Sequence, residues 1–284
     1  MFDGKNMKWN LNRISLGTKL IIFISVAVLL LLTVLFLGIF ITPEKYAVNY
    51  AEKFISPSKA HPFGTDFMGR DMFFRCIKGL STSIVIGICT TIVSSVIALV
   101  FGISSAVIGG KFDKFVLFCV DCCMGLPHIV LLILISFLLG RGERGVIFSI
   151  ALTHWPELTR LVRSEVLQVR SKQYIAVAYK MGKTRLQVAA EHIFPHVLPV
   201  YIVGMVMTFP HAIVHESSIT FLGFGLPAET PAIGIILSEA MKHIVTGKWW
   251  LAVFPGLMLI AVVLLFHVIG ESMRKIFSPV GSRE

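Results

Sequence analysis

Six apolar stretches, each long enough to cross a lipid bilayer as a helix, constrain this chain more than any other feature. A helix satisfies its own backbone hydrogen bonds and needs about twenty apolar residues to span the hydrocarbon core. Of the 284 residues, 55% are hydrophobic and only 15% are charged, which excludes an ordinary soluble domain. We therefore predict an all-α polytopic membrane protein with six transmembrane helices, at residues 20–42, 81–109, 115–139, 145–161, 197–222 and 249–270.

The fourth stretch is the weakest of the six, because polar residues and a proline interrupt it before Arg160 closes it. The interrupting residues are His154, Trp155, Pro156 and Glu157. We expect its C-terminal end to lie at the membrane interface or against protein.

Basic residues indicate which segments face the cytosol. The chain starts with a basic segment and continues into an apolar run that is too long for a signal peptide, so we expect an uncleaved first helix. The net charge of +10 fits cytoplasmic loops and anionic lipid headgroups better than nucleic acid. The expected order is a cytoplasmic N-terminus (1–19), helix one (20–42), an extracytoplasmic loop (43–80), a transmembrane domain with helices two to six (81–270) and a cytoplasmic C-terminus (271–284).

A basic segment at residues 170–199 separates the fourth and fifth apolar stretches. Thr184 and Gln187 have the spacing of a helix-capping box, and Gly182 stands where a preceding helix could end in a left-handed turn. The segment therefore predicts helix, glycine turn, helix. An apolar stripe in the second helix is expected at Leu186, Ala189, Ala190, Ile193 and Val197. Such a helix pair either lies on headgroups or docks a soluble partner.

The tripeptide Gly182-Lys183-Thr184 also suggests a phosphate-binding loop, but that motif needs a glycine at position 177, where this chain has Val177. If transport here is driven by ATP, we expect another subunit to bind the nucleotide.

Ionisable side chains at membrane depth indicate a pathway or a partner. His211 and His215 share one face of the fifth helix, with Glu216 adjacent, and could present imidazoles to a metal or to a peptide carboxylate. Packing against a neighbouring helix is the alternative. His192 and His196 repeat the spacing, but without a third ligand neither pair defines a metal site. The remaining candidates are Asp121, which we expect near the interface or a lysine, His128 and His267.

Four ordered motifs resemble permease subunits of binding-protein-dependent ABC importers, specifically the C-type subunit of the peptide and nickel branch. The resemblance covers about residues 61–279. The first motif is the coupling loop of that family, although its usual Glu-Ala-Ala triplet is Ala176-Val177-Ala178 here. The others are residues 61–66 (HPFGTD) with 69–71 (GRD), 216–225 (ESSITFLGFG) and 254–256 (FPG).

The resemblance implies a type I importer permease fold and a heterodimer with a homologous second permease. It also implies two cytoplasmic ATPase subunits, which bind ATP and Mg²⁺, and an extracytoplasmic substrate-binding protein for peptides or nickel and other metal complexes. This chain would bind no cofactor and catalyse no reaction, and it would lie in the plasma membrane with both termini in the cytosol. The residues assigned to ATPase coupling are Ala176, Val177, Ala178, Gly182, Thr184, Ile193 and Pro199, and those assigned to the substrate pathway are His211, His215 and Glu216.

Two other classes of membrane protein compete with this interpretation. An ion-coupled secondary transporter or channel would use the intramembrane histidines and glutamate as a relay and would need no ATPase. A membrane-embedded metalloenzyme would need a ligand set of the HExxH kind, which the sequence lacks.

Overall fold

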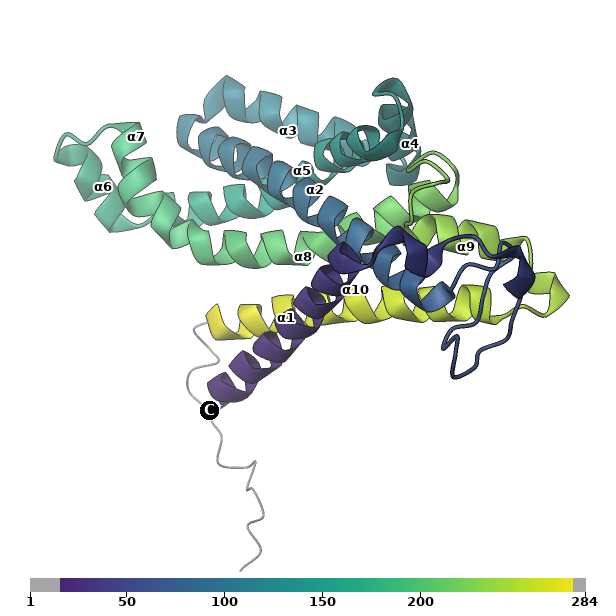
Figure 1. The fold of residues 1–284 in the computed structure, drawn as a ribbon. Coiled ribbons are helices and arrows are strands. Elements are labelled where there is room, and N and C mark those ends of the chain that lie inside the picture. Colours follow the sequence, from purple (N-terminus) through teal and green to yellow (C-terminus); the bar gives the residue numbers. More distant parts are fainter. Residues whose placement is uncertain (1–15, 278–284) are drawn as a thin grey trace, which may run out of the picture.

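The computed structural model describes residues 16–277, and throughout that range the regular elements are helical (Figure 1). The predicted cytoplasmic termini lie largely outside the described residues. The helices are α1 (Leu16–Phe40), η2 (Pro43–Tyr46), η3 (Tyr50–Glu52), α2 (Met72–Ile108), α3 (Gly110–Gly125), α4 (His128–Leu138), α5 (Gly142–Arg170), α6 (Gln173–Lys180), α7 (Arg185–Val188), the π-helical turn η4 (Ala189–Ile193), α8 (Phe194–Phe221), α9 (Ile233–Met241), η5 (Ile244–Thr246) and α10 (Trp250–Phe277).

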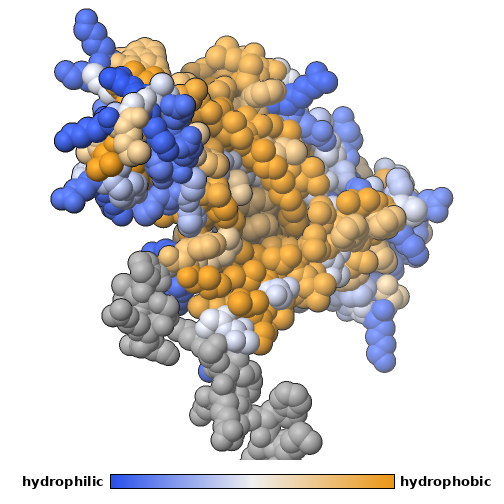
Figure 2. Space-filling view, turned by 90° about the vertical axis from the view of Figure 1, so that its left-hand side faces the viewer, coloured by the Kyte–Doolittle hydropathy of each residue, from blue (hydrophilic) through white to orange (hydrophobic). Residues whose placement is uncertain are grey.

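Four helical segments within residues 16–277 are long and apolar enough to cross a membrane. They comprise α1, α2, the α7–α8 segment and α10. Large apolar side chains remain exposed along them, and Figure 2 shows hydrophobic residues over a broad area of one face. This pattern fits helices whose outer faces contact lipid. The all-α polytopic fold is therefore confirmed.

The third predicted span is not one straight helix. It is divided into α3 and α4, which are bent by 100° and form either one broken span, which would be the fifth, or a re-entrant loop. The break falls at Leu126 and Pro127. Proline lacks a backbone N–H and clashes with the preceding helical turn, which explains why a continuous helix over 115–139 was wrong.

The fourth predicted span lies within α5, which is 29 residues long but is not among the helices apolar enough to cross. Only part of the interrupted stretch packs against protein. His154, Trp155 and Pro156 are all buried, whereas Glu157 and Arg160 are exposed. The expectation that this end of the stretch lies against protein is confirmed for His154, Trp155 and Pro156.

Helix α2 begins nine residues before the predicted start of the second span, because Asp71 caps it. The Asp71 carboxylate accepts hydrogen bonds from the Phe73 and Phe74 N–H groups at 2.8 and 3.3 Å. Just before this cap, the carboxylate of Asp66 accepts from two backbone N–H groups of its own turn. The HPFGTD and GRD motifs therefore form a turn and a helix cap in front of α2.

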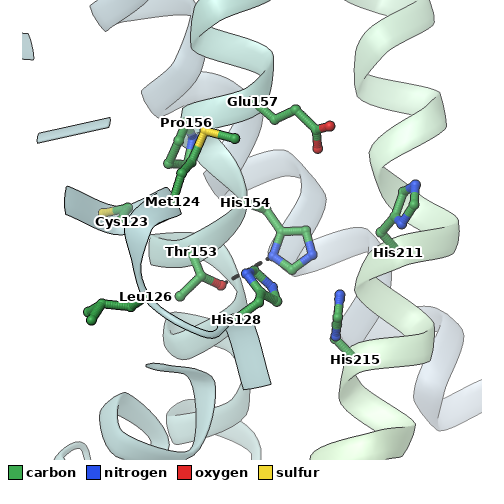
Figure 3. A pocket seen from close by; sticks show the side chains of 10 residues that line it. All are labelled: Cys123, Met124, Leu126, His128, Thr153, His154, Pro156, Glu157, His211 and His215. Carbon is green, nitrogen blue, oxygen red and sulfur yellow. Dashed lines mark hydrogen bonds between the residues drawn. The ribbon is translucent and has the colours of Figure 1, made fainter. Parts of the chain in front are cut away.

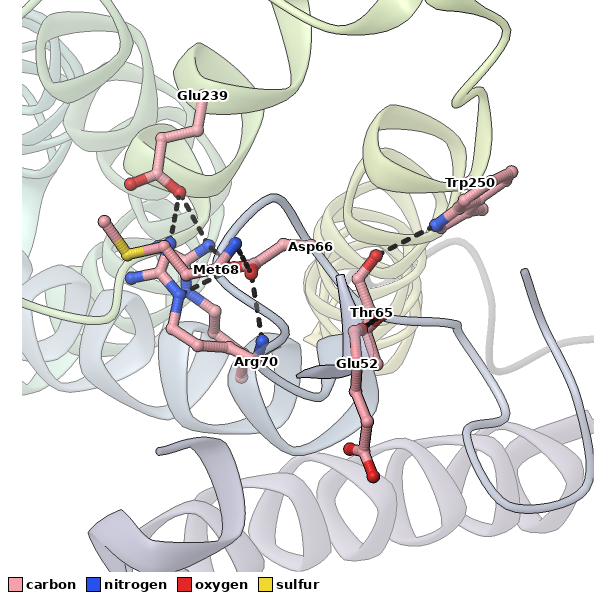
Figure 4. Close-up of polar contacts among 8 residues, drawn as sticks. Glu52, Thr65, Asp66, Met68, Arg70, Glu239 and Trp250 are labelled. Carbon is pink, nitrogen blue, oxygen red and sulfur yellow. Dashed lines mark hydrogen bonds and ion pairs between the residues drawn. The ribbon is translucent and has the colours of Figure 1, made fainter. Parts of the chain in front are cut away.

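Two arginines and two acids join this loop to α9 (Figure 4). Asp66 pairs with Arg70 at 2.6 Å and with Arg75 at 3.0 Å, and Glu239 pairs with the same two guanidinium groups at 3.0 and 2.6 Å. The two positive and two negative charges balance, which is the condition under which charges can be buried. The network fixes the loop and α9 at one end of the molecule.

Helices α2, α5 and α8 form the centre of the packing, with α1 and α10 on one side (Figure 1). The α6–α7 hairpin, which we define as residues 173–188, lies at the end opposite to α9 (Figure 1). The hairpin is not loosely attached, because residues of the hairpin and of the following turn belong to the same buried cluster as residues of α2 and α5. They are Ile175, Ala178 and Val188 of the hairpin, with Ala189 and Ile193 of the turn.

Candidate functional site

Helix α6 ends in a Schellman motif at Gly182. The Gly182 N–H donates to the Tyr179 carbonyl at 3.0 Å, and the Lys183 N–H donates to the Ala178 carbonyl at 3.2 Å. These bonds satisfy carbonyls that a helix end otherwise leaves without partners. Gly182 has a φ of +86°, a conformation that costs energy for residues with a Cβ atom. The predicted left-handed turn is confirmed.

A capping box starts helix α7. The Thr184 hydroxyl accepts a hydrogen bond from the Gln187 N–H at 3.3 Å, and the Gln187 side-chain carbonyl accepts from the Thr184 N–H at 2.9 Å. Two orphan N–H groups at the helix start are thus satisfied reciprocally. The predicted sequence of helix, glycine turn and helix is confirmed by these two caps.

The predicted apolar stripe is only partly correct. Leu186 is 79% exposed and Ala190 is also exposed, so neither packs into the core. The stripe assumed one uniform α-helix, but η4 is a π-helical turn, which holds more residues per turn and shifts the register. Ala189, Ile193 and Val197 of the predicted stripe are buried, and Val188, which was not predicted, is buried with them.

The seven residues predicted to couple the chain to an ATPase divide by exposure. Ala178 and Ile193 are buried in the core, and Pro199 is half-buried inside α8. The exposed ones are Ala176, Val177, Gly182 and Thr184. Met181 is 77% exposed beside the turn. The hairpin therefore anchors itself through one face and presents apolar side chains on the other.

Ion pairs join α5, the helix that precedes the hairpin, to α3. Arg163 on α5 donates two hydrogen bonds to the Asp113 carboxylate on α3, both at 2.7 Å. This two-bond geometry is the stronger form of an arginine–carboxylate pair. Asp121 pairs with Arg160 rather than with a lysine.

Four histidines line a cavity of about 270 Å³ between α4, α5 and α8 (Figure 3). His211 and His215 both come from α8, as the four-residue spacing predicted. His154 comes from α5, and His128 is the first residue of α4, directly after the break at Pro127. Ring centroids of His128 and His215 are 4.4 Å apart, and those of His128 and His154 are 4.8 Å apart.

Glu216 does not line this cavity. Its side chain is fully buried elsewhere and accepts hydrogen bonds from the Thr220 hydroxyl at 3.1 Å and the Ser217 hydroxyl at 3.3 Å. Consecutive residues of a helix point about 100° apart, so Glu216 cannot share a face with His215. The structure brings together only two of the three predicted pathway residues.

Sequence reasoning missed the contributions of His128, His154 and Glu157 to this cavity. Each was visible as a polar residue in an apolar stretch, but they come from two other helices. The signal that could have found them is that all three interrupt apolar runs. Their convergence depends on the packing of α4 and α5 against α8, and α4 begins after a bend that the apolar pattern did not predict.

Several permease proteins are similar in sequence to this chain. The dipeptide transport system permease protein DppC of Bacillus subtilis is 28% identical over 86% of this chain and 76% of its own length. The probable D,D-dipeptide transport system permease protein DdpC of Escherichia coli is 28% identical over 98% of this chain and 92% of its own length. A putative peptide transport system permease protein of Brucella suis is 32% identical over 82% of this chain and 78% of its own length.

The fold is similar to that of a chain in the inward-facing MetNI methionine ABC transporter, with a TM-score of 0.61 over 73% of this chain and 98% of that chain. At 16% identity, this match concerns the fold alone, which is that of a type I importer permease. The model of the binding-protein-dependent transport system inner membrane component family matches residues 98–280. A secondary transporter or channel is therefore not favoured. The chain belongs to the family of inner membrane components of binding-protein-dependent transport systems, and it is a multi-pass permease subunit.

Proposed function

We propose that this chain forms half of the translocation pathway of an ATP-driven importer for peptides, or for nickel and other metal complexes. The relatives supporting a peptide substrate are named as dipeptide, oligopeptide and D,D-dipeptide permeases. The observation that carries the coupling part of the proposal is the α6–α7 hairpin, which is anchored in the core and exposes apolar side chains at one end of the molecule.

The assembly contains a homologous second permease, two cytoplasmic ATPase subunits that bind ATP and Mg²⁺, and an extracytoplasmic binding protein. This chain binds no nucleotide or other cofactor for that function. Both termini and the hairpin face the cytosol, and the loop before α2 faces the opposite side.

The mechanism is a conformational equilibrium biased by the ATPase subunits, with no bond chemistry in this chain. Closure of the ATPases on ATP pulls or rotates the hairpin. Because the buried face of the hairpin is continuous with the α2–α5 core, that displacement reaches the long helices as a rigid-body motion. The long helices then alternate between outward-open and inward-open arrangements.

Cysteine cross-linking tests where the ATPase docks. In a background without the five native cysteines, Val177→Cys on the exposed side of α6 should cross-link to the ATPase subunit. Val245→Cys in η5 is the matched control, because it is even more exposed but follows α9 at the opposite end of the molecule. Equal cross-linking at both positions, or cross-linking only at position 245, would overturn the assignment.

His211 and His215 face the cavity, so substrate contact is proposed for them but not for Glu216. Replacement of both histidines by alanine should change the concentration dependence of uptake while the amount of assembled complex stays constant. Unchanged uptake kinetics would assign these side chains to packing.

A further inference from the structure

His128, His154 and His215 have the arrangement of a ligand set. Each offers one ring nitrogen, and these three nitrogens lie within 4.8 Å of one another. The ring centroids of His154 and His215 are 5.1 Å apart, which completes a compact triangle of imidazoles (Figure 3). The three rings come from three different helices, so the cluster depends on the tertiary fold.

The hydrogen bonding of the cluster leaves lone pairs for a ligand. His154 Nδ1 lies 2.9 Å from the Ile150 carbonyl, which can only accept, so this nitrogen carries the proton and Nε2 carries a lone pair. A ring fixed in this way through its other nitrogen is typical of metal-binding histidines. His128 Nε2 and His215 Nδ1 are buried and have no hydrogen-bond partner among the described residues.

Unpartnered ring nitrogens in the interior of a protein need an explanation, because buried polar atoms normally find a partner. A shared cation explains both of them at once. Tetrahedral zinc with Zn–N bonds of about 2.0–2.1 Å places its nitrogens roughly 3.3 Å apart. Binding would therefore require the three nitrogens, which lie within 4.8 Å of one another, to move closer together.

We infer that His128, His154 and His215 bind one divalent transition-metal ion of the class that prefers imidazole, such as Zn²⁺, Ni²⁺ or Cu²⁺. Three protein ligands leave a fourth position, which opens into the cavity that the three histidines line. Water or a carboxylate can occupy that position, and Glu157 is the acidic residue on the cavity wall. The site shares His215 and its cavity with the proposed substrate pathway, but the inference concerns metal binding itself, whichever substrate is carried.

The test uses Co²⁺ alone as the probe and the assembled complex in lipid nanodiscs. Tetrahedral Co²⁺ with nitrogen ligands has visible absorption bands. We expect band intensities that correspond to one Co²⁺ ion per chain, and added Zn²⁺ should abolish these bands. X-ray absorption of the wild-type complex should show about three imidazole nitrogens around the ion. This measurement needs no variant and therefore does not depend on how well a variant folds.

Single His→Gln replacements at positions 128, 154 and 215 should each abolish the bands while the complex elutes normally. His267→Gln is the matched control, because it changes an exposed histidine of α10 outside the cluster and should retain them. The inference is overturned if wild-type complex holds no Co²⁺ after desalting, or if the three variants hold it as well as the control. Transport is not the readout, so a negative result here leaves the importer proposal standing.

Discussion

Gly182→Val tests whether the turn between α6 and α7 transmits force from an ATPase. Gly182 has a φ of +86°, and a Cβ atom there would meet no other atom within 4 Å. The cost of valine is therefore almost entirely backbone strain, about 1–2 kcal/mol for a left-handed residue. That energy shifts the turn away from its native geometry by a factor of roughly 5 to 30. We expect uptake per ATP hydrolysed to fall by up to that factor while the complex remains assembled.

Gly223→Val is the matched control for this prediction. Gly223 ends α8 in the same type of motif, with a φ of +83°, and a Cβ atom added there would also meet nothing within 4 Å. Its backbone strain is the same, but it lies far from the hairpin in the fold. Gly182→Asn should restore part of the coupling, since asparagine tolerates the left-handed region better than valine.

The assay reconstitutes the complex in proteoliposomes and measures substrate uptake and ATP hydrolysis in the same sample. The ratio of the two should fall for Gly182→Val and hold for Gly223→Val. Normal uptake with normal substrate-stimulated ATPase activity in Gly182→Val would refute the role of the turn. An equal fall in both variants would assign the effect to general destabilisation.

Three further predictions concern stability, each measured as the unfolding of purified protein in detergent. Asp66→Ala removes one of two carboxylates that pair with buried Arg75 and partly buried Arg70, and it should cost about 3 kcal/mol, whereas Asp121→Ala in an exposed pair should cost about 0–1 kcal/mol. Thr184→Ala removes the capping box of α7 and should cost about 1 kcal/mol. Gly102→Leu should cost about 1–3 kcal/mol or more, the usual cost of overpacking a core, because a Cβ atom at position 102 would lie 2.6 Å from a methyl carbon of Val162. Gly256→Leu, where a Cβ meets nothing within 4 Å, is its control; similar losses in both would contradict the packing argument.

Local chemistry made several features predictable from sequence. The Gly182 turn and the Thr184 capping box depend on residues a few positions apart, so they can be recognised without knowledge of the fold. The apolar stretches likewise predicted where long helices lie. The π-helical turn at Ala189–Ile193 was not anticipated, and it displaced two residues of the expected stripe.

The candidate site was less predictable because its parts come from distant segments. His211 and His215 could be paired by helical spacing, but His128 lies just after the 100° bend between α3 and α4, and His154 comes from α5. Glu216 was assigned by adjacency in sequence, and its side chain instead accepts hydrogen bonds from neighbouring hydroxyls. Tertiary packing determines which side chains of different helices meet, and the periodicity of one helix does not predict that packing.

The importer assignment is tested most directly by uptake of a labelled peptide into proteoliposomes that contain this chain with and without its partner subunits. We expect uptake only when the second permease, the ATPases, the binding protein and ATP are all present. Uptake by this chain alone, driven by an ion gradient in the absence of ATP, would show that the chain is not an importer subunit.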